Sequence, residues 1–147
     1  MYNFFSNMSD GIYIQCLGYM MKICDQFALI QRHIDIYESD EEDNIVLALS
    51  PYLIKEDRVK KWEGGIHKIY SNNKKKLRNN RHIYECSKDA LKILKVYGHF
   101  SNYESDIDIS FFQKDRIIFW TISHENYCFI DKNIYSKMRK ELKIEEL

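Results

Sequence analysis

Apolar residues recur every three or four positions through the first quarter of the chain, which is the period of one face of a helix. The residues that follow this spacing are Cys16, Met20, Ile23, Phe27, Ile30 and Ile34. They predict a long N-terminal helix over residues 12–34. Ser9 or Asp10 can cap it, although the stretch that begins at Gly11 is also compatible with the start of a strand.

The middle of the chain shows shorter patterns that change every few residues. Ile45 to Leu49 is a continuous apolar run followed by Pro51, which is typical of a buried strand. Asparagine-rich stretches tolerate left-handed turn geometry and therefore predict a loop between two strands. The elements expected here are a strand over residues 45–49, a short helix over residues 52–63, and strands over residues 66–70 and 82–86.

The last third of the chain gives the clearest pattern. Ser87 can cap a helix over residues 88–97, and Gly98 is suited to end it. Three candidate strands follow, separated by turns short enough for hairpins, and Asp131 or Asn133 then caps a terminal amphipathic helix. The strands of this antiparallel meander are expected at residues 106–112, 116–123 and 127–130, and the terminal helix carries Ile134, Met138 and Leu142.

These elements predict an α+β fold in a single domain over residues 1–147. We expect an antiparallel sheet, with a C-terminal β-meander, packed by a long N-terminal helix, a central helix and a C-terminal helix. A chain of 147 residues with 45% hydrophobic and 14% aromatic residues can bury such a core without a disulfide or a metal ion.

The composition also bears on origin and location. Isoleucine, lysine, asparagine and tyrosine are frequent, as in AT-rich coding sequences, which indicates a low-GC bacterium or its phage. The longest early uncharged stretch, residues 11–21, is too short to cross a bilayer, so we expect a cytoplasmic protein. The cysteines Cys16, Cys24, Cys86 and Cys128 form no CxxC pair, and we interpret all four as reduced packing residues, with no metal or cofactor.

One stretch resembles an enzyme signature. The segment from Val96 to Asp108 is similar to that of nucleotidyltransferases, in which a glycine-serine turn precedes an Asp-x-Asp strand whose two carboxylates hold Mg²⁺ against nucleotide phosphates. Here His99 replaces the serine, and the gap before Asp106 is too short for the intervening helix. Asp106 and Asp108 are equally what one face of a half-exposed strand produces. A metal-dependent enzyme using this pair is therefore an alternative hypothesis.

Two further patterns have a functional and a structural interpretation. His124 and Glu125 could form an acid/base pair, but a polar pair between two apolar strands is most simply a turn. The segment 55–82 is locally basic, and Trp62 and Tyr70 within it and Tyr84 just after it could stack on bases. Because the net charge is zero and acidic blocks flank this segment, attraction to a phosphate backbone is partly cancelled. A nucleic-acid-binding regulator is a second alternative.

The acidic residues favour a protein partner. Six acids lie within residues 35–43, and a second concentration follows around the meander at Glu104, Asp106, Asp108 and Asp115. If both groups lie on one side of the fold, they form a negative surface suited to a basic protein. A nuclease toxin is such a partner, because its groove must be positive to hold nucleic acid.

The predicted hairpin, formed by residues 106–112 and 118–127, is similar in pattern to bacterial toxin-immunity proteins. The resemblance implies inhibition of a toxin by occlusion and transfers no residue roles. It leads us to predict a non-enzymatic inhibitor with a protein partner, with aromatic side chains at the centre of the contact. The candidate partner-binding residues are Glu38, Asp40, Glu41, Glu42, Asp43, Glu104, Asp106, Asp108, Trp120 and Tyr127.

Overall fold

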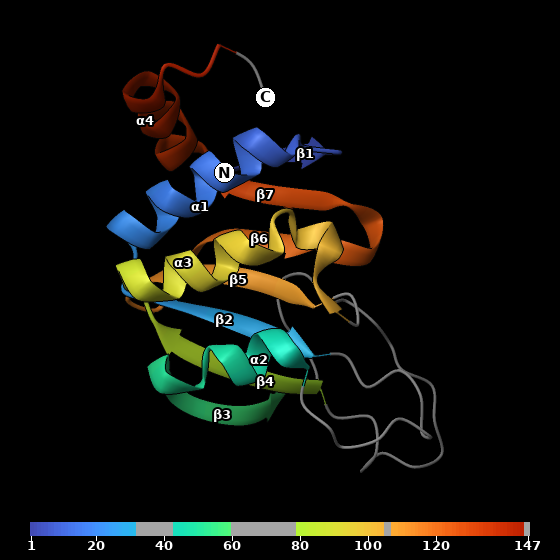
Figure 1. Cartoon of the computed structure of the whole chain (residues 1–147). Coiled ribbons are helices and arrows are strands. Elements are labelled where there is room, and N and C mark those ends of the chain that lie inside the picture. The colour runs from blue at the N-terminus through green and yellow to red at the C-terminus, as the bar shows by residue number, and fades with distance from the viewer. Residues whose placement is uncertain (32–42, 60–78, 105–106, 146–147) are drawn as a thin grey trace.

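Seven strands form one antiparallel sheet in the computed structural model, which describes residues 1–31, 43–59, 79–104 and 107–145. The strand order is β1-β7-β6-β5-β2-β4-β3, so the first and the last strand of the sequence pair at one edge (Figure 1). The predicted α+β class, the antiparallel sheet and its C-terminal meander are confirmed. The strands are β1 (Tyr2–Ser6), β2 (Gln26–Gln31), β3 (Leu53–Val59), β4 (Asn79–Glu85), β5 (Asp108–Gln113), β6 (Arg116–Ile122) and β7 (Tyr127–Asp131).

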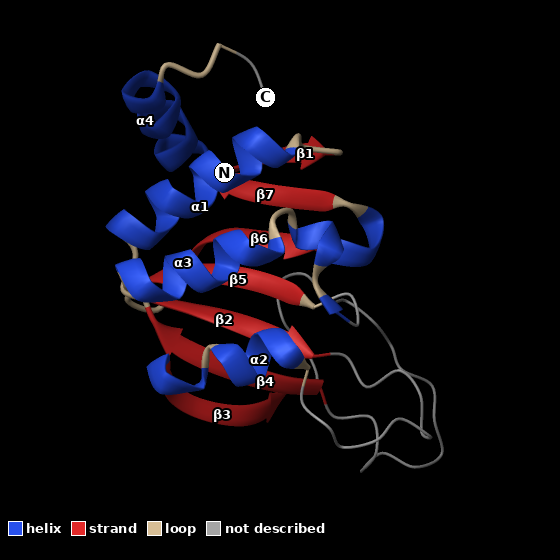
Figure 2. Ribbon diagram, in the orientation of Figure 1, coloured by secondary structure: helices blue, strands red, loops and turns tan. Residues whose placement is uncertain are grey.

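The described helices lie on one side of this sheet (Figure 2). They are α1 (Asp10–Ile23), α2 (Asn44–Ala48), α3 (Lys88–Tyr97) and α4 (Lys132–Leu142). Helix α1 packs against α3, α4 and β5, and α4 also contacts β7 and β1. We call this side of the sheet the helix-covered face. The other side, over which no helix of the described residues lies, is the helix-free face.

Strand alternation assigns each side chain to one of these two faces. Phe27, Phe111 and Phe119 belong to the main hydrophobic core beneath the helices. Their neighbours in sequence, such as Ala28, Ser110 and Trp120, therefore point to the helix-free face, because successive side chains of a strand alternate.

The helices begin where capping side chains were expected. The Ile12 backbone N–H donates to Ser9 Oγ at 3.3 Å, and the Ala90 N–H donates to Ser87 Oγ at 3.0 Å. Asp131 Oδ1 accepts from the N–H groups of Asn133 and Ile134, both at 3.0 Å. The predicted helix over residues 88–97 is confirmed, and Gly98 ends it with a φ of 73°.

The long helix predicted over residues 12–34 is wrong in its second half. Helix α1 ends at Ile23, and Gln26–Gln31 forms β2 between β4 and β5. A central strand that is buried on both faces is a continuous apolar run, which periodicity alone cannot distinguish from a helix.

Two shorter predictions are also wrong. The segment predicted as a strand at residues 45–49 lies mostly in the helix α2, which ends at Ala48. Of the residues 52–63 predicted as a helix, Leu53–Val59 form β3, and residues 60–63 lie outside the described residues. Strand β1 was not predicted at all. The strand predicted over residues 66–70 lies outside the described residues.

Candidate functional site

A cluster of five aromatic side chains covers the helix-free face where β6, β7 and β1 lie side by side. Phe4 is in register with Phe129, and Phe129 with Trp120, so these three residues form a row across the strands. Tyr2 and Tyr127 alternate in phase with them and project to the same face. We call Tyr2, Phe4, Trp120, Tyr127 and Phe129 the aromatic cluster.

The rings of the aromatic cluster are in direct contact. Trp120 and Phe129 are stacked with centroids 4.8 Å apart and planes 10° from parallel. Tyr2 meets Trp120 edge-on at 4.6 Å, and Phe4 meets Tyr127 edge-on at 4.8 Å. Stacked and edge-on pairs are the favourable geometries for aromatic rings. The Tyr2 hydroxyl also donates to the Ile117 carbonyl at 2.9 Å, which fixes this ring against β6.

Exposure increases across the cluster toward the edge of the sheet. Trp120 is only 8% exposed, whereas Phe4 on the edge strand is 52% exposed. Tyr2, Tyr127 and Phe129 are half-buried. The result is a preorganised apolar surface with a buried base and an accessible rim. Contiguous exposed apolar surface of this kind is typical of interaction sites.

The predicted acidic contact residues fall into three groups. Glu38, Asp40, Glu41, Glu42 and Asp106 lie outside the described residues. Asp43 directly precedes α2, and Glu104 Oε1 accepts from the Ile45 N–H in the first turn of this helix at 3.3 Å. Asp43 Oδ2 accepts from Gln31 Nε2 at 3.0 Å, and Gln31 Oε1 contacts His82 Nε2 at 2.8 Å. These two acids are on the helix-covered side, away from Trp120 and Tyr127.

Asp108 has a structural position that the sequence analysis did not foresee. Its side chain is 0% exposed, so it cannot contribute to an exposed acidic surface. Asp108 Oδ1 accepts from the Ser123 N–H at 2.8 Å, and Ser123 Oγ donates to the Ile107 carbonyl at 2.6 Å. The half-exposed strand predicted here is instead a central strand, and the carboxylate joins β5 to the end of β6.

The described residues of the proposed acid/base pair and of the basic segment have structural positions. His124 and Glu125 lie in a short 3-10 turn between β6 and β7, with 3.4 Å between Nε2 and Oε1, so the turn interpretation is confirmed. In the basic segment, Arg81 donates twice to Asp57, at 2.9 and 2.5 Å. Tyr84 is fully buried and is not accessible to a base, and Trp62 and Tyr70 lie outside the described residues.

The four cysteines are free thiols, as predicted. Burial raises the pKa of Cys16 and of Cys86 to about 12, and it also raises the pKa of Cys24 and Cys128. Within residues 1–31, 43–59, 79–104 and 107–145, no three His, Cys, Asp or Glu side chains are grouped so as to hold a metal ion. No helix in the same ranges is long and apolar enough to cross a membrane.

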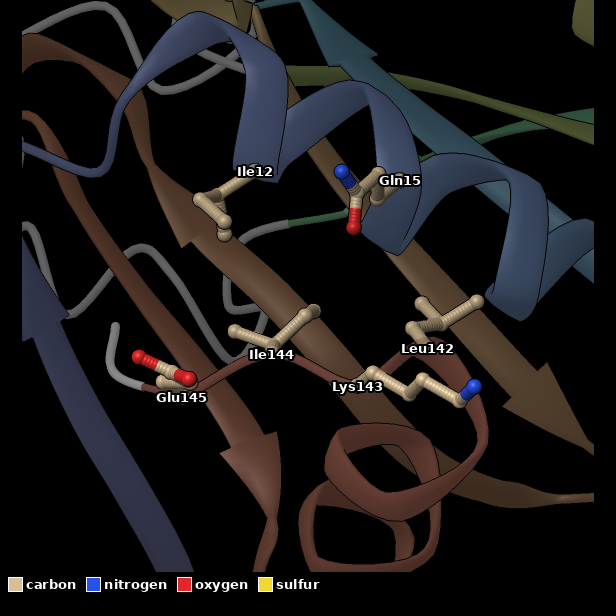
Figure 3. Close-up of a pocket in the computed structure, with 6 residues that line it drawn as sticks. All are labelled: Ile12, Gln15, Leu142, Lys143, Ile144 and Glu145. Atoms are coloured by element: carbon tan, nitrogen blue, oxygen red, sulfur yellow. The ribbon is translucent and has the colours of Figure 1, made fainter.

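Two hollows flank the first turn of α1. The first, of about 550 Å³, lies between α1 and the segment that follows α4 (Figure 3). The second, of about 560 Å³, lies beside the end of β1 and shares Ile12 with the first. The first is lined by Ile12, Gln15, Leu142, Lys143, Ile144 and Glu145, and the second by residues 4–9 and Ile12. Neither contains a group of converging acids or histidines.

Two members of the aromatic cluster, Trp120 and Tyr127, were predicted from the sequence as contact residues, whereas Tyr2, Phe4 and Phe129 were not. The available signal was the alternation of Tyr2 with Phe4 and of Tyr127 with Phe129, which is the period of a strand.

Comparison with protein-family models, with curated proteins and with solved structures finds no match for this chain.

Proposed function

We propose that this chain is a non-enzymatic binding protein, and specifically an immunity protein that neutralises a cognate bacterial toxin in the cytoplasm by covering it. The observation that carries the proposal is the aromatic cluster on the helix-free face. Trp and Tyr are enriched among the residues that dominate protein–protein binding energy, because they bury a large area at a small cost in side-chain entropy. Here the rings already pack on one another, which lowers that cost further.

The acidic segments support a basic partner. Six acids lie within residues 35–43, and the last of them, Asp43, precedes α2, whose Ile45 N–H donates to Glu104. Negative charge of this density speeds the encounter with a cationic protein and does so less at high salt. In this proposal the aromatic cluster makes the contact and determines how slowly the complex dissociates, whereas the acids, of which Asp43 and Glu104 lie on the other side of the sheet, act only through the long-range field on the rate of association.

The test uses the protein whose gene lies immediately upstream, if that gene encodes a secreted protein with a variable C-terminal domain. That domain, purified and mixed with this chain, should bind with a stable stoichiometry in isothermal titration calorimetry. Co-expression of the two should restore growth that the toxin domain alone prevents. No binding and no rescue would remove the proposal.

Two variants locate the surface. Tyr127→Ala and Phe129→Ala should each weaken binding by about 30-fold or more, as truncation of a central aromatic residue does. Val96→Ala is the matched control, because Val96 is an apolar side chain that is 83% exposed on α3, on the other side of the sheet. Equal affinities for all three variants would place the contact elsewhere. Circular dichroism verifies that each variant is folded.

A further inference from the structure

Strand β1 forms an open edge of the sheet. Among the strands of the described residues, it pairs with β7 alone. The Lys132 N–H donates to the Met1 carbonyl at 2.8 Å, and the Asn7 N–H donates to the Asn126 carbonyl at 3.0 Å. The backbone N–H and C=O groups of the odd-numbered residues along β1 therefore point toward β7. In an antiparallel pair the hydrogen-bonding residues alternate, and the backbone N–H and C=O of Phe4 and Ser6 therefore point away from β7.

Strand β1 lacks charges, proline and a bulge, which are three of the features that normally prevent one sheet from pairing with another. Edge strands are usually protected by charges, proline, bulges or a covering element. The other edge of this sheet has two of these, since β3 carries Lys55, Glu56 and Asp57 and has an irregular register near Ile54. Strand β1 reads Tyr-Asn-Phe-Phe-Ser, with no charge and no proline, and its pairing with β7 is regular.

We propose that a second copy of this chain pairs with β1, antiparallel and centred on Phe4, so that two seven-stranded sheets join into one. Phe4 is the middle residue of the five-residue strand, and its backbone groups point outward. Two identical strands related by a two-fold axis can then exchange two hydrogen bonds between their Phe4 residues, because this is the symmetry of an isologous contact. The two Phe4 side chains, each 52% exposed, meet beside the axis on the helix-free face.

Charge favours a second copy over other occupants. An isologous contact places each residue near its own counterpart, so any net charge on the strand repels itself. The uncharged β1 avoids this penalty, whereas a partner chosen for the acidic residues of this protein would gain nothing from an uncharged strand. A contact of one strand pair is small, and we expect a dimer that dissociates in the micromolar range or above. This inference does not depend on the proposed function.

Sedimentation velocity over a wide concentration range tests the proposal. The mass should rise from the chain mass of 17.8 kDa toward twice that value. Phe4→Lys and Phe4→Glu should each remain monomeric, because like charges then meet at the axis. An equimolar mixture of the two, with one labelled, should dimerise again because the charges are opposite. Ile54→Lys is the matched control, since Ile54 is 49% exposed on β3 at the other edge, and it should dimerise like the original chain.

A second pair of variants tests the backbone contact without changing Phe4. Ser6→Pro removes an outward N–H, which an edge strand tolerates in the monomer, and should weaken dimerisation about tenfold or more relative to Ser6→Ala. A chain that stays monomeric at every concentration overturns the proposal, as does a dimer that neither Phe4→Lys nor Ser6→Pro affects. If the chain is monomeric and Ser6→Pro instead weakens binding of a different protein, then that protein and not a second copy occupies the edge.

Discussion

Replacing Asp108 by alanine should destabilise the fold and leave any response to divalent metal ions unchanged. The side chain is fully buried, and its Oδ1 atom accepts from the Ser123 N–H at 2.8 Å. Ser123 is itself part of a buried network, in which its Oγ donates to the Ile107 carbonyl at 2.6 Å and lies 3.0 Å from Thr121 Oγ1. Thr121 Oγ1 in turn accepts from the Ile109 N–H at 3.0 Å.

The magnitude follows from the groups that would lose a partner. Asp108→Ala leaves the Ser123 N–H buried without an acceptor, which costs roughly 1 to 3 kcal/mol of unfolding free energy. For a chain of this size each kcal/mol lowers the melting temperature by about 2 to 4 °C, so the expected decrease is roughly 2 to 12 °C. Asp108→Asn keeps an acceptor oxygen in a side chain of the same size, so its decrease in melting temperature should lie at the low end of this range. The exposed Glu141→Ala should change stability by less than about 0.5 kcal/mol.

Thermal unfolding measured with and without Mg²⁺ or Mn²⁺ separates this structural role from the metal-binding alternative. At every metal concentration we expect the melting temperature to be lowest for Asp108→Ala, higher for Asp108→Asn and highest for the original chain. Two results would refute the reasoning: Asp108→Ala melting like the original chain, or a metal ion raising the melting temperature of the original chain but not that of Asp108→Asn. The second result would make Asp108 a metal ligand.

Two further predictions concern titration. Hydrogen bonds from Arg81 lower the pKa of Asp57 below its usual value, so the stabilisation from this pair is present above about pH 4, the unfolded value, and is lost as the pH falls through the lower folded value. Asp57→Asn should therefore lower the unfolding free energy by about 1 kcal/mol or less at pH 7 and leave it unchanged in strong acid. Urea denaturation of the variant and the original chain measures this difference, and a difference that does not depend on pH would contradict the prediction. Cys86, the one half-buried thiol among the four, has a pKa raised to about 12 and should be alkylated slowly at neutral pH and faster as the pH rises. Mass spectrometry that finds Cys16 modified as fast as Cys86 in the folded protein would contradict the burial of Cys16.

The parts of the fold that the sequence predicted are those determined by nearby residues. Helix α3 follows from Ser87 as its cap and Gly98 as its end, which lie within the same segment. The meander β5–β6–β7 follows from two short turns, where Lys114 and Asn126 adopt left-handed conformations. Local chemistry of this kind is visible in a single sequence.

The parts that the sequence did not predict depend on contacts between distant segments. Strand β2 is recognisable as a strand only because β4 and β5 pair with its two sides, and both begin more than 45 residues further along the chain. Strand β1 pairs with β7 from the opposite end of the chain. The aromatic cluster shares this dependence, because Tyr2 and Phe4 join Trp120 only after that pairing forms. Asp108 was misplaced for the same reason, since its burial depends on where β5 lies in the sheet.

The two halves of the helix-free face differ in how they meet the solvent, and this difference locates the proposed contact. An antiparallel sheet with helices on one side is stable when its other side carries polar residues. At β3 and β4 this condition is met, because Lys55, Asp57 and Arg81 form ion pairs there. At β6, β7 and β1 the same face carries rings instead, and Phe4 keeps 52% of its surface exposed. Exposed aromatic area adds nothing to the folding of a monomer, so its concentration in one half of the face is best explained by a partner that buries it, which is why we assign the contact to this half.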